Sequence, residues 1–172
     1  MTRAFVSVKN SGLTEIADYL DQLGDKFDEI TYQSVQSMQD VVVERIKVNW
    51  TTMIGGQTSG YVYDSIGMST ANSKNDDHVV LGTMGVYKLD AVDAAHGKTA
   101  KDLNAAQIAY WVEYGTSRLK NGGRKVKGVD YSDEDMISVA PQPFIGNAFY
   151  TSVNEQNSAF KIKFNELVDK IK

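Results

Sequence analysis

The sequence predicts an α+β domain in which a small antiparallel β-sheet packs against two long helices and shorter ones. Apolar residues recur every three to five positions over residues 27–50, and a mostly apolar series that includes Gln156 recurs at spacings of three and four over residues 143–171, which is typical of one face of a helix. Between them lie two β-like runs, residues 67–71 and 78–83, joined by a polar stretch rich in turn formers. Helices on either side of a hairpin indicate an α+β fold.

Two short elements are expected before the first long helix. Residues 4–9 place Val6 and Val8 two positions apart, which predicts a strand that joins the hairpin in one sheet. Residues 14–23 have helical spacing, so a short amphipathic helix is predicted there, with Gly24 as its stop.

The long helix over residues 27–50 has an apolar face wider than one stripe. Val41, Val43 and Val48 lie beside the main series of apolar residues. A wide face indicates contact on two sides, of which one is the core. We take Val41 and Val48 as candidate contacts with another subunit.

The rest of the pattern predicts one more helix and two loops. Residues 101–114 have helical spacing, and Gly115 is expected to cap the C-terminal end. Residues 51–60 and 117–135 contain several glycines and few core residues, which is the composition of loops. We expect both loops to be mobile in the free chain and to become ordered when a partner docks. A length of 172 residues fits one domain over residues 1–172.

The bulk composition limits the classes of function. With 18 Lys and Arg against 22 Asp and Glu, the net charge of -4 gives no attraction of the whole chain to a phosphate backbone. No apolar stretch approaches the roughly 18 residues that span a bilayer, so we expect no membrane contact. Zero cysteines exclude disulfides and thiolate catalysis, and two histidines leave few ligands for zinc.

Motifs for chemistry are scarce. Asp90, Asp93 and His96 have the spacing of metal ligands on a helix, although a solvated polar face explains the same residues. The glycine pairs lack the Gly-Lys-Ser/Thr ending of a phosphate-binding loop, and no Gly-x-Ser-x-Gly elbow occurs. We therefore expect no catalytic residue, no metal and no cofactor, and the chain is not expected to be an enzyme. A small hydrolase that uses His78 or His96 is the rival interpretation.

One segment is strongly basic. Its cationic residues are Arg118, Lys120, Arg124, Lys125 and Lys127. Contact with a DNA phosphate backbone would use such a segment and would make the affinity depend steeply on salt. A solvated loop is the alternative, because the acidic residues that follow would partly cancel the positive field.

Three stretches of the chain carry recognisable motifs. Residues 60–66 read Gly-Tyr-Val-Tyr-Asp-Ser-Ile, residues 108–116 read Ile-Ala-Tyr-Trp-Val-Glu-Tyr-Gly-Thr, and residues 141–148 read Pro-Gln-Pro-Phe-Ile-Gly-Asn-Ala. In this order they resemble the Gly-x-Leu-x-x-Ser-Ile, Tyr-Ala-x-x-Val-Glu-Phe-Gly-Thr and Pro-x-Pro-Phe-(Leu/Ile)-x-x-Ala motifs of the tail-completion family of long-tailed bacteriophages. These neck or minor tail proteins include those similar to lambda tail protein Z. Residues 85–104 form a longer connection than in many members.

The resemblance implies a structural virion protein that completes the tail and joins it to the filled head. It implies a ring, expected to be hexameric, at the head-proximal end of the tail. The implied partners are copies of the chain, the tail terminator or tail tube, and head-completion proteins, with double-stranded DNA passing through the ring. The implied location is the virion, and the host cytoplasm during assembly. Closing such a ring needs a head-to-tail contact between two different surface patches.

The second motif contains the candidate interface residues. Glu113 at the C-terminal end of a helix opposes the helix macrodipole, unless it pairs with Arg118 or with a neighbouring subunit. We therefore take Glu113, Tyr114, Thr116 and Arg118 as candidate contacts with partners. The alternative is that the motif residues only form the fold.

Other motif residues are expected to be structural. Gly115 suits a left-handed cap, Pro143 suits the first turn of the last helix, and Phe144 would fill the core beneath the hairpin. The remaining structural candidates are Gly60, Ser65 and Ile66 at the entry to the hairpin.

Overall fold

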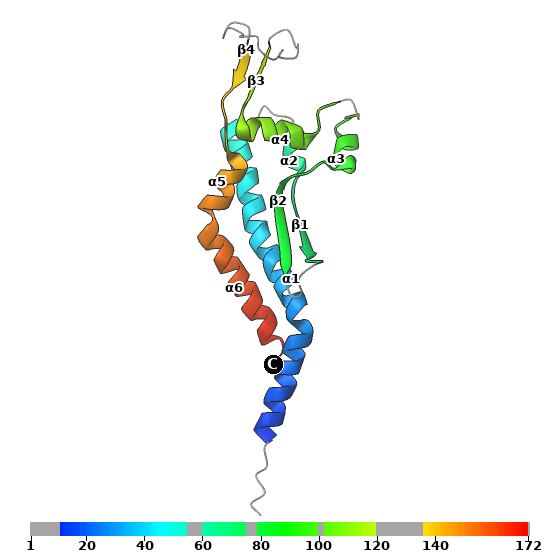
Figure 1. The fold of residues 1–172 in the computed structure, drawn as a ribbon, viewed down its shortest axis with the longest axis vertical. Helices are drawn as coiled ribbons and strands as arrows, with labels where there is room; N and C mark the ends of the chain where they lie inside the picture. The colour runs from blue at the N-terminus through cyan, green and yellow to red at the C-terminus, as the bar shows by residue number, and fades with distance from the viewer. Residues whose placement is uncertain (1–10, 55–59, 75–78, 100–101, 120–135, 172) are drawn as a thin grey trace, which may run out of the picture.

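The chain folds into helices and two small hairpins, which confirms the predicted α+β class (Figure 1). The computed structural model describes residues 11–54, 60–74, 79–99, 102–119 and 136–171. Its elements are α1 (Ser11–Ile54), α2 (Gly60–Asp64), β1 (Ile66–Asn72), β2 (Val80–Val86), α3 (Asp90–Ala95), α4 (Ala105–Tyr114), β3 (Thr116–Leu119), β4 (Met136–Val139), α5 (Phe144–Thr151) and α6 (Val153–Asp169). The strands form two separate antiparallel pairs, β1 with β2 and β3 with β4.

Helix α1 is one continuous helix of 44 residues, so it is about 66 Å long. The predicted stop at Gly24 is wrong, because the chain stays helical through this residue. A glycine inside a helix costs only about 1 kcal/mol relative to alanine, and helical turns on both sides outweigh that cost. The predicted loop over residues 51–60 is helical at its start, since α1 continues to Ile54. Residues 55–59 lie outside the described residues.

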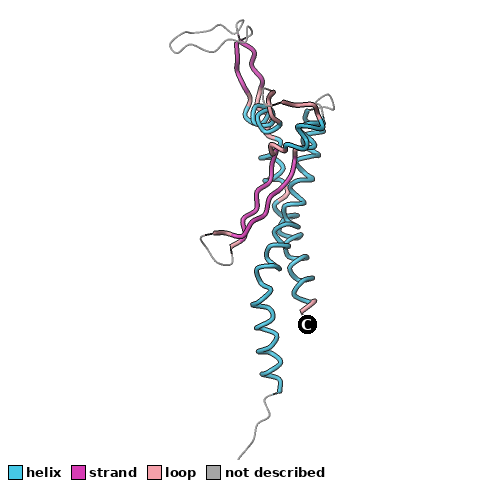
Figure 2. Tube along the Cα trace, turned by 90° about the vertical axis from the view of Figure 1, so that its right-hand side faces the viewer, coloured by secondary structure: helices cyan, strands magenta, loops and turns pink. Residues whose placement is uncertain are grey.

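Helix α6 runs antiparallel to α1 and covers part of its length (Figure 1). Near the end of α6, the rings of Phe27 and Phe164 meet edge to face with centroids 6.4 Å apart. Near its start, Arg45 Nη2 donates to both carboxylate oxygens of Glu155, at 3.0 and 2.8 Å. The start of α1 extends beyond α6 (Figures 1 and 2), and Ile16 is 56% exposed there.

The helix predicted over residues 143–171 is in fact two helices, α5 and α6, which meet at Ser152. The Ser152 hydroxyl donates to the carbonyl of Ala148 (2.7 Å), and Gln156 Nε2 donates to the carbonyl of Phe149 (2.8 Å). Both polar side chains are buried, so their bonds satisfy groups that the break would otherwise leave without partners. Apolar spacing continues across the break, which is why periodicity did not reveal it.

The predicted β1–β2 hairpin is confirmed, and its strands pair antiparallel over their whole length. One face packs on α1, where Gln39 is fully buried and its Nε2 donates to the carbonyls of Ser69 (3.0 Å) and Thr83 (2.9 Å). A Cβ at Gly82 would lie 2.8 Å from Gln39 Cδ. Glycine at this position therefore allows helix and hairpin to approach closely.

The second hairpin, β3–β4, lies at the opposite end of the molecule from the start of α1 (Figure 1). Because β3 extends from Thr116 to Leu119, the prediction of a loop from residue 117 is wrong for its first residues. Each strand has only four residues, too few to show an alternating pattern. Residues 120–135 of the predicted loop, and the strand predicted over residues 4–9, lie outside the described residues.

The core lies between the second half of α1, α2, the base of the β1–β2 hairpin, α4 and α5. Its members are Val42, Val43, Ile46, Trp50, Tyr61, Val62, Ile66, Ala105, Ala109, Phe144 and Ala148. Helix α4 begins later than predicted, because Asn104 and Gln107 form a reciprocal capping box at its start. Among the described helices, none is long and apolar enough to cross a membrane.

Candidate protein interaction site

The three stretches that carry the family motifs meet in one place. Ile66 from the first, Ala109 from the second and Phe144 from the third belong to the same buried cluster. Trp50 of α1 packs on Phe144 with ring centroids 4.9 Å apart, and Asn49 Nδ2 donates to the Phe144 carbonyl at 3.0 Å. The expected burial of Phe144 in the core is therefore confirmed.

Tyr61 connects the first stretch to α3 and α4. Its hydroxyl donates to Asp93 Oδ1 (2.5 Å) and accepts from the N–H of Ala105 (3.1 Å). Burial raises the pKa of the Tyr61 phenol above its usual value, and the hydrogen bond to Asp93 adds to this effect. In the same stretch, the buried Ser65 hydroxyl donates to the Tyr61 carbonyl (2.8 Å). Tyr61 was not selected from the sequence, although it follows the first motif residue.

Glu113 caps the start of α5. Its Oε2 accepts from the N–H of Ile145 and its Oε1 from the N–H of Gly146, both at 2.8 Å. The pairing predicted from the sequence, with Arg118 or with a neighbouring subunit, stays a prediction, since the side chain of Arg118 is not among those described. The first N–H groups of a helix have no acceptor within the helix, so the Glu113 carboxylate supplies one for two of them. The positive end of the α5 dipole also favours a carboxylate at this position. Glu113 is buried, and its two hydrogen bonds join α4 to the start of α5.

Gly115 and Pro143 flank this junction. Gly115 has a positive φ of 74°, which glycine adopts easily, but its ψ of 171° leads the chain directly into β3. Gly115 therefore ends α4 as predicted, but it does not adopt the left-handed helical conformation, because a strand begins at the next residue. Pro143 lies one residue before α5 and has no side-chain cap of its own. Its expected place in the first turn is wrong by one residue, and Glu113 supplies the cap.

The outer side of α4 exposes two tyrosines. Tyr110 is 61% exposed and Tyr114 is 66% exposed, and their ring centroids lie 4.9 Å apart. A cleft of about 270 Å³ opens beside them, lined by Val86, Ala106, Ala109, Tyr110, Glu113, Tyr114, Ile145 and Gly146. We call the two tyrosines and this cleft the tyrosine surface. Of its two tyrosines, Tyr114 was selected from the sequence and Tyr110 was not.

No protein-family model, curated protein or solved structure matches the chain. The resemblance to the tail-completion family therefore rests on the three sequence motifs alone.

The other candidate contacts that the structure describes lie on α1 and β3. Val41 is half-buried on α1, and Val48 is 55% exposed. Thr116 is half-buried at the start of β3. Arg118 lies in β3, but its side chain is not among those described. The other cationic candidates for DNA contact, Lys120, Arg124, Lys125 and Lys127, lie outside the described residues.

The residues with metal-ligand spacing have separate partners. Asp93 accepts from Tyr61, and His96 Nε2 lies 2.8 Å from Asp64 Oδ2. Within the described part of the chain, no three His, Cys, Asp or Glu side chains are grouped to hold a metal ion. A polar cavity of about 540 Å³ lies beside Tyr61, and Lys98 and Asp102 are among its lining residues. His78, the other histidine of the hydrolase interpretation, lies outside the described residues.

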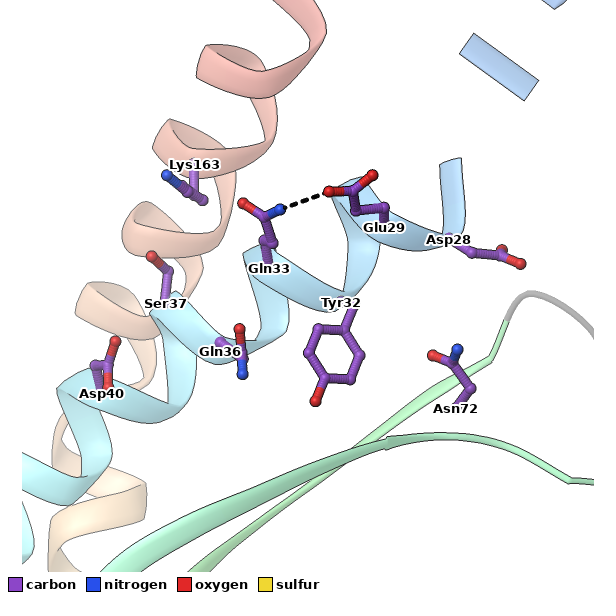
Figure 3. A pocket seen from close by; sticks show the side chains of 9 residues that line it. All are labelled: Asp28, Glu29, Tyr32, Gln33, Gln36, Ser37, Asp40, Asn72 and Lys163. Atoms are coloured by element: carbon purple, nitrogen blue, oxygen red, sulfur yellow. Dashed lines mark hydrogen bonds between the residues drawn. The ribbon is translucent and has the colours of Figure 1, made fainter. Parts of the chain in front are cut away.

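A wider polar groove lies between α1, α6 and the far end of β1 (Figure 3). It has a volume of about 720 Å³ and is lined by Asp28, Glu29, Tyr32, Gln33, Gln36, Ser37, Asp40, Asn72 and Lys163. Gln33 and Glu29 are hydrogen-bonded to each other at 3.1 Å. Acidic side chains outnumber the basic one in this lining, so the groove suits water or a cationic group better than an anion.

Proposed function

We propose that the chain is a structural virion protein that completes a phage tail and joins it to the head. It acts by binding copies of itself and neighbouring virion proteins, and not by catalysis. The three motifs support this proposal, and so does the way they form one buried junction with an exposed aromatic surface. The tyrosine surface is the single observation that carries it.

The tyrosine surface has the properties of a protein contact. Tyrosine is enriched among residues that dominate binding energy, because its ring buries a large area and its hydroxyl still finds a polar partner. Tyr110 and Tyr114 stand one helical turn apart on α4, next to the buried residues Ala109 and Glu113 that hold the helix in place. A rigid helix thus presents the two rings in a fixed arrangement.

The proposed assembly is a ring, expected to contain six copies, with double-stranded DNA passing through it. Ring closure by a head-to-tail contact needs a second patch that differs from the first. Val48, exposed on α1, marks the second patch in this proposal, and half-buried Val41 lies two turns before it. The tail terminator or tail tube would bind on one side of the ring and head-completion proteins on the other, with no membrane involved.

The test is deletion of the gene in its phage, followed by electron microscopy. The expected result is full heads and separate tails that do not join. Complementation with Tyr110→Ser and Tyr114→Ser together should fail, while Ile162→Ser, a matched change of an exposed residue on α6, should restore infectious virions. Thermal unfolding of the purified variants verifies that they are folded. Normal virions from the deletion mutant would contradict the proposal.

A further inference from the structure

The hydrogen bonds at the two ends of the β1–β2 hairpin show which backbone groups point outward. Tyr87 N–H donates to the Ser65 carbonyl (2.9 Å), and Ser73 N–H donates to the Val79 carbonyl (2.7 Å). Both pairs continue the register of the strands. Hydrogen-bonded and non-bonded pairs alternate in an antiparallel ladder. Odd-numbered residues therefore bond across the hairpin, and even-numbered residues direct their N–H and C=O groups to its two outer edges.

The outer edge of β2 is the more open of the two. Its outward groups belong to Val80, Gly82 and Met84, and no other group in the described part of the chain forms a hydrogen bond with them. On β1, the outward carbonyl of Thr70 already accepts from the Tyr32 hydroxyl at 3.1 Å. We therefore expect a strand of another chain to pair along β2, since pairing there does not require a bond like that of Tyr32 to break.

Neither strand has the sequence features that normally keep an exposed edge strand from pairing with another chain. Monomeric proteins place charges, prolines or bulges on exposed edge strands, because unpaired backbone groups recruit other chains. The sequences Ile-Gly-Met-Ser-Thr-Ala-Asn and Val-Leu-Gly-Thr-Met-Gly-Val of β1 and β2 contain no charge and no proline. Leu81, Gly82 and Thr83 are exposed along β2. An unprotected edge of this kind is typical of a strand that pairs with another chain.

We propose that β2 pairs antiparallel with β2 of a second copy of this chain, which makes a four-stranded sheet in the order β1–β2–β2–β1. A twofold axis brings any strand antiparallel to itself, so the contact needs only one surface. With the axis at Thr83, the middle of β2, Gly82 lies opposite the second copy's Met84, and both direct backbone groups outward. No charge on the strand opposes the approach of its copy. This contact goes beyond the proposed ring and does not depend on the proposed phage role.

The first test uses the absence of cysteine in the chain. In the Thr83→Cys variant, the two thiols would face each other across the axis in a non-bonded pair, where Cα atoms lie about 4.5 Å apart. Mild oxidation should therefore give a disulfide-linked dimer. Ser69→Cys is the matched control, because Ser69 is the register partner of Thr83 and is exposed on β1. It should remain monomeric under the same oxidation.

A mixture of the two cysteine variants distinguishes the other arrangement. If β2 paired with β1 of the next copy, the main product would join Ser69→Cys to Thr83→Cys. That heterodimer as the main product would overturn the proposal, and so would equal yields from the two single variants.

The second test blocks one edge at a time. Proline at an even-numbered position removes an outward N–H and leaves the bonds inside the hairpin intact. Val80→Pro should abolish the concentration-dependent dimer in sedimentation equilibrium, whereas Asn72→Pro, at the register partner on β1, should leave it. Circular dichroism shows whether each variant is folded. A folded Val80→Pro variant that dimerises as well as the original chain would refute the pairing.

Discussion

Glu113 stabilises a helix whose first N–H groups lie 32 and 33 residues later in the chain. The motif made this residue a candidate, but local sequence could not reveal its partner, because α4 and α5 are brought together only by the core. The partner of Tyr61 is also distant in the sequence, since its hydroxyl accepts from the N–H of Ala105, 44 residues away. At the residue scale, therefore, burial of Phe144 could be predicted from an apolar motif, whereas polar contacts over long separations could not.

The cap on α5 can be tested with Glu113→Gln. The carboxylate accepts two N–H bonds, whereas an amide has one acceptor oxygen and turns its N–H₂ group toward the second donor. The variant should lose roughly 1–3 kcal/mol of unfolding free energy in guanidinium titrations at neutral pH. Glu155→Gln, which removes a surface pair with Arg45, should cost less than about 1 kcal/mol. Similar losses in both variants would argue against the cap.

Tyr61 should give the fold an alkaline limit. Its raised pKa means that the folded chain holds the phenol proton more tightly than the unfolded chain does. This contribution is complete below the usual tyrosine pKa of about 10, and it is lost as the pH rises through the folded-state pKa. Tyr61→Phe should unfold with roughly 1–3 kcal/mol less free energy at neutral pH, because Asp93 and the Ala105 N–H lose their partner.

Urea titrations between about pH 9 and pH 11 check the second part of this expectation. The original chain should lose more stability over this range than Tyr61→Phe, which has no phenol to ionise. Tyr63→Phe is the control, since it removes the same hydroxyl from a tyrosine that is 40% exposed and lies outside the core. Parallel pH profiles for the original chain and Tyr61→Phe would show that another group sets the alkaline limit.

At the scale of elements, the periodic segments could be predicted and their boundaries could not. Apolar stripes identified α1, α4 and the last helical segment, and the β-like runs identified the β1–β2 hairpin, whereas α2 and α3 are too short to show a repeat. Gly24 suggested a stop that α1 does not make, because a single glycine is too weak a signal against long helical flanks. The sequence around Ser152 did not predict the break between α5 and α6, because no glycine or proline marks it. A hydrogen bond from the Gln156 side chain to the Ser152 hydroxyl stabilises the break instead. For the candidate site, the motif predicted Tyr114, while Tyr110 required the observed face of α4.

At the scale of the whole molecule, α1 joins a packed region to a projecting one. Its second half contributes Ile46 and Trp50 to the core, whereas Ile16 and Leu20 near its start are more than half exposed. The projecting part is acidic, with four acidic residues and no lysine or arginine over residues 11–25. Like charges disfavour pairing of this part with its own copy, so its exposed apolar residues do not compete with the proposed β2 contact.

The two regions of α1 should respond differently to substitution. The double variant Ile16→Gln, Leu20→Gln replaces two exposed apolar residues with glutamine, which has a similar helix propensity. Its unfolding free energy should therefore change by only about 0.5 kcal/mol. Phe27→Ala removes the edge-to-face contact with Phe164 and should cost more, on the order of 1–3 kcal/mol, because it separates α1 from α6. Guanidinium unfolding of the two variants measures the difference. A loss in the double variant as large as that of Phe27→Ala would mean that the start of α1 is packed in solution, and that its projection is not a feature of the free chain.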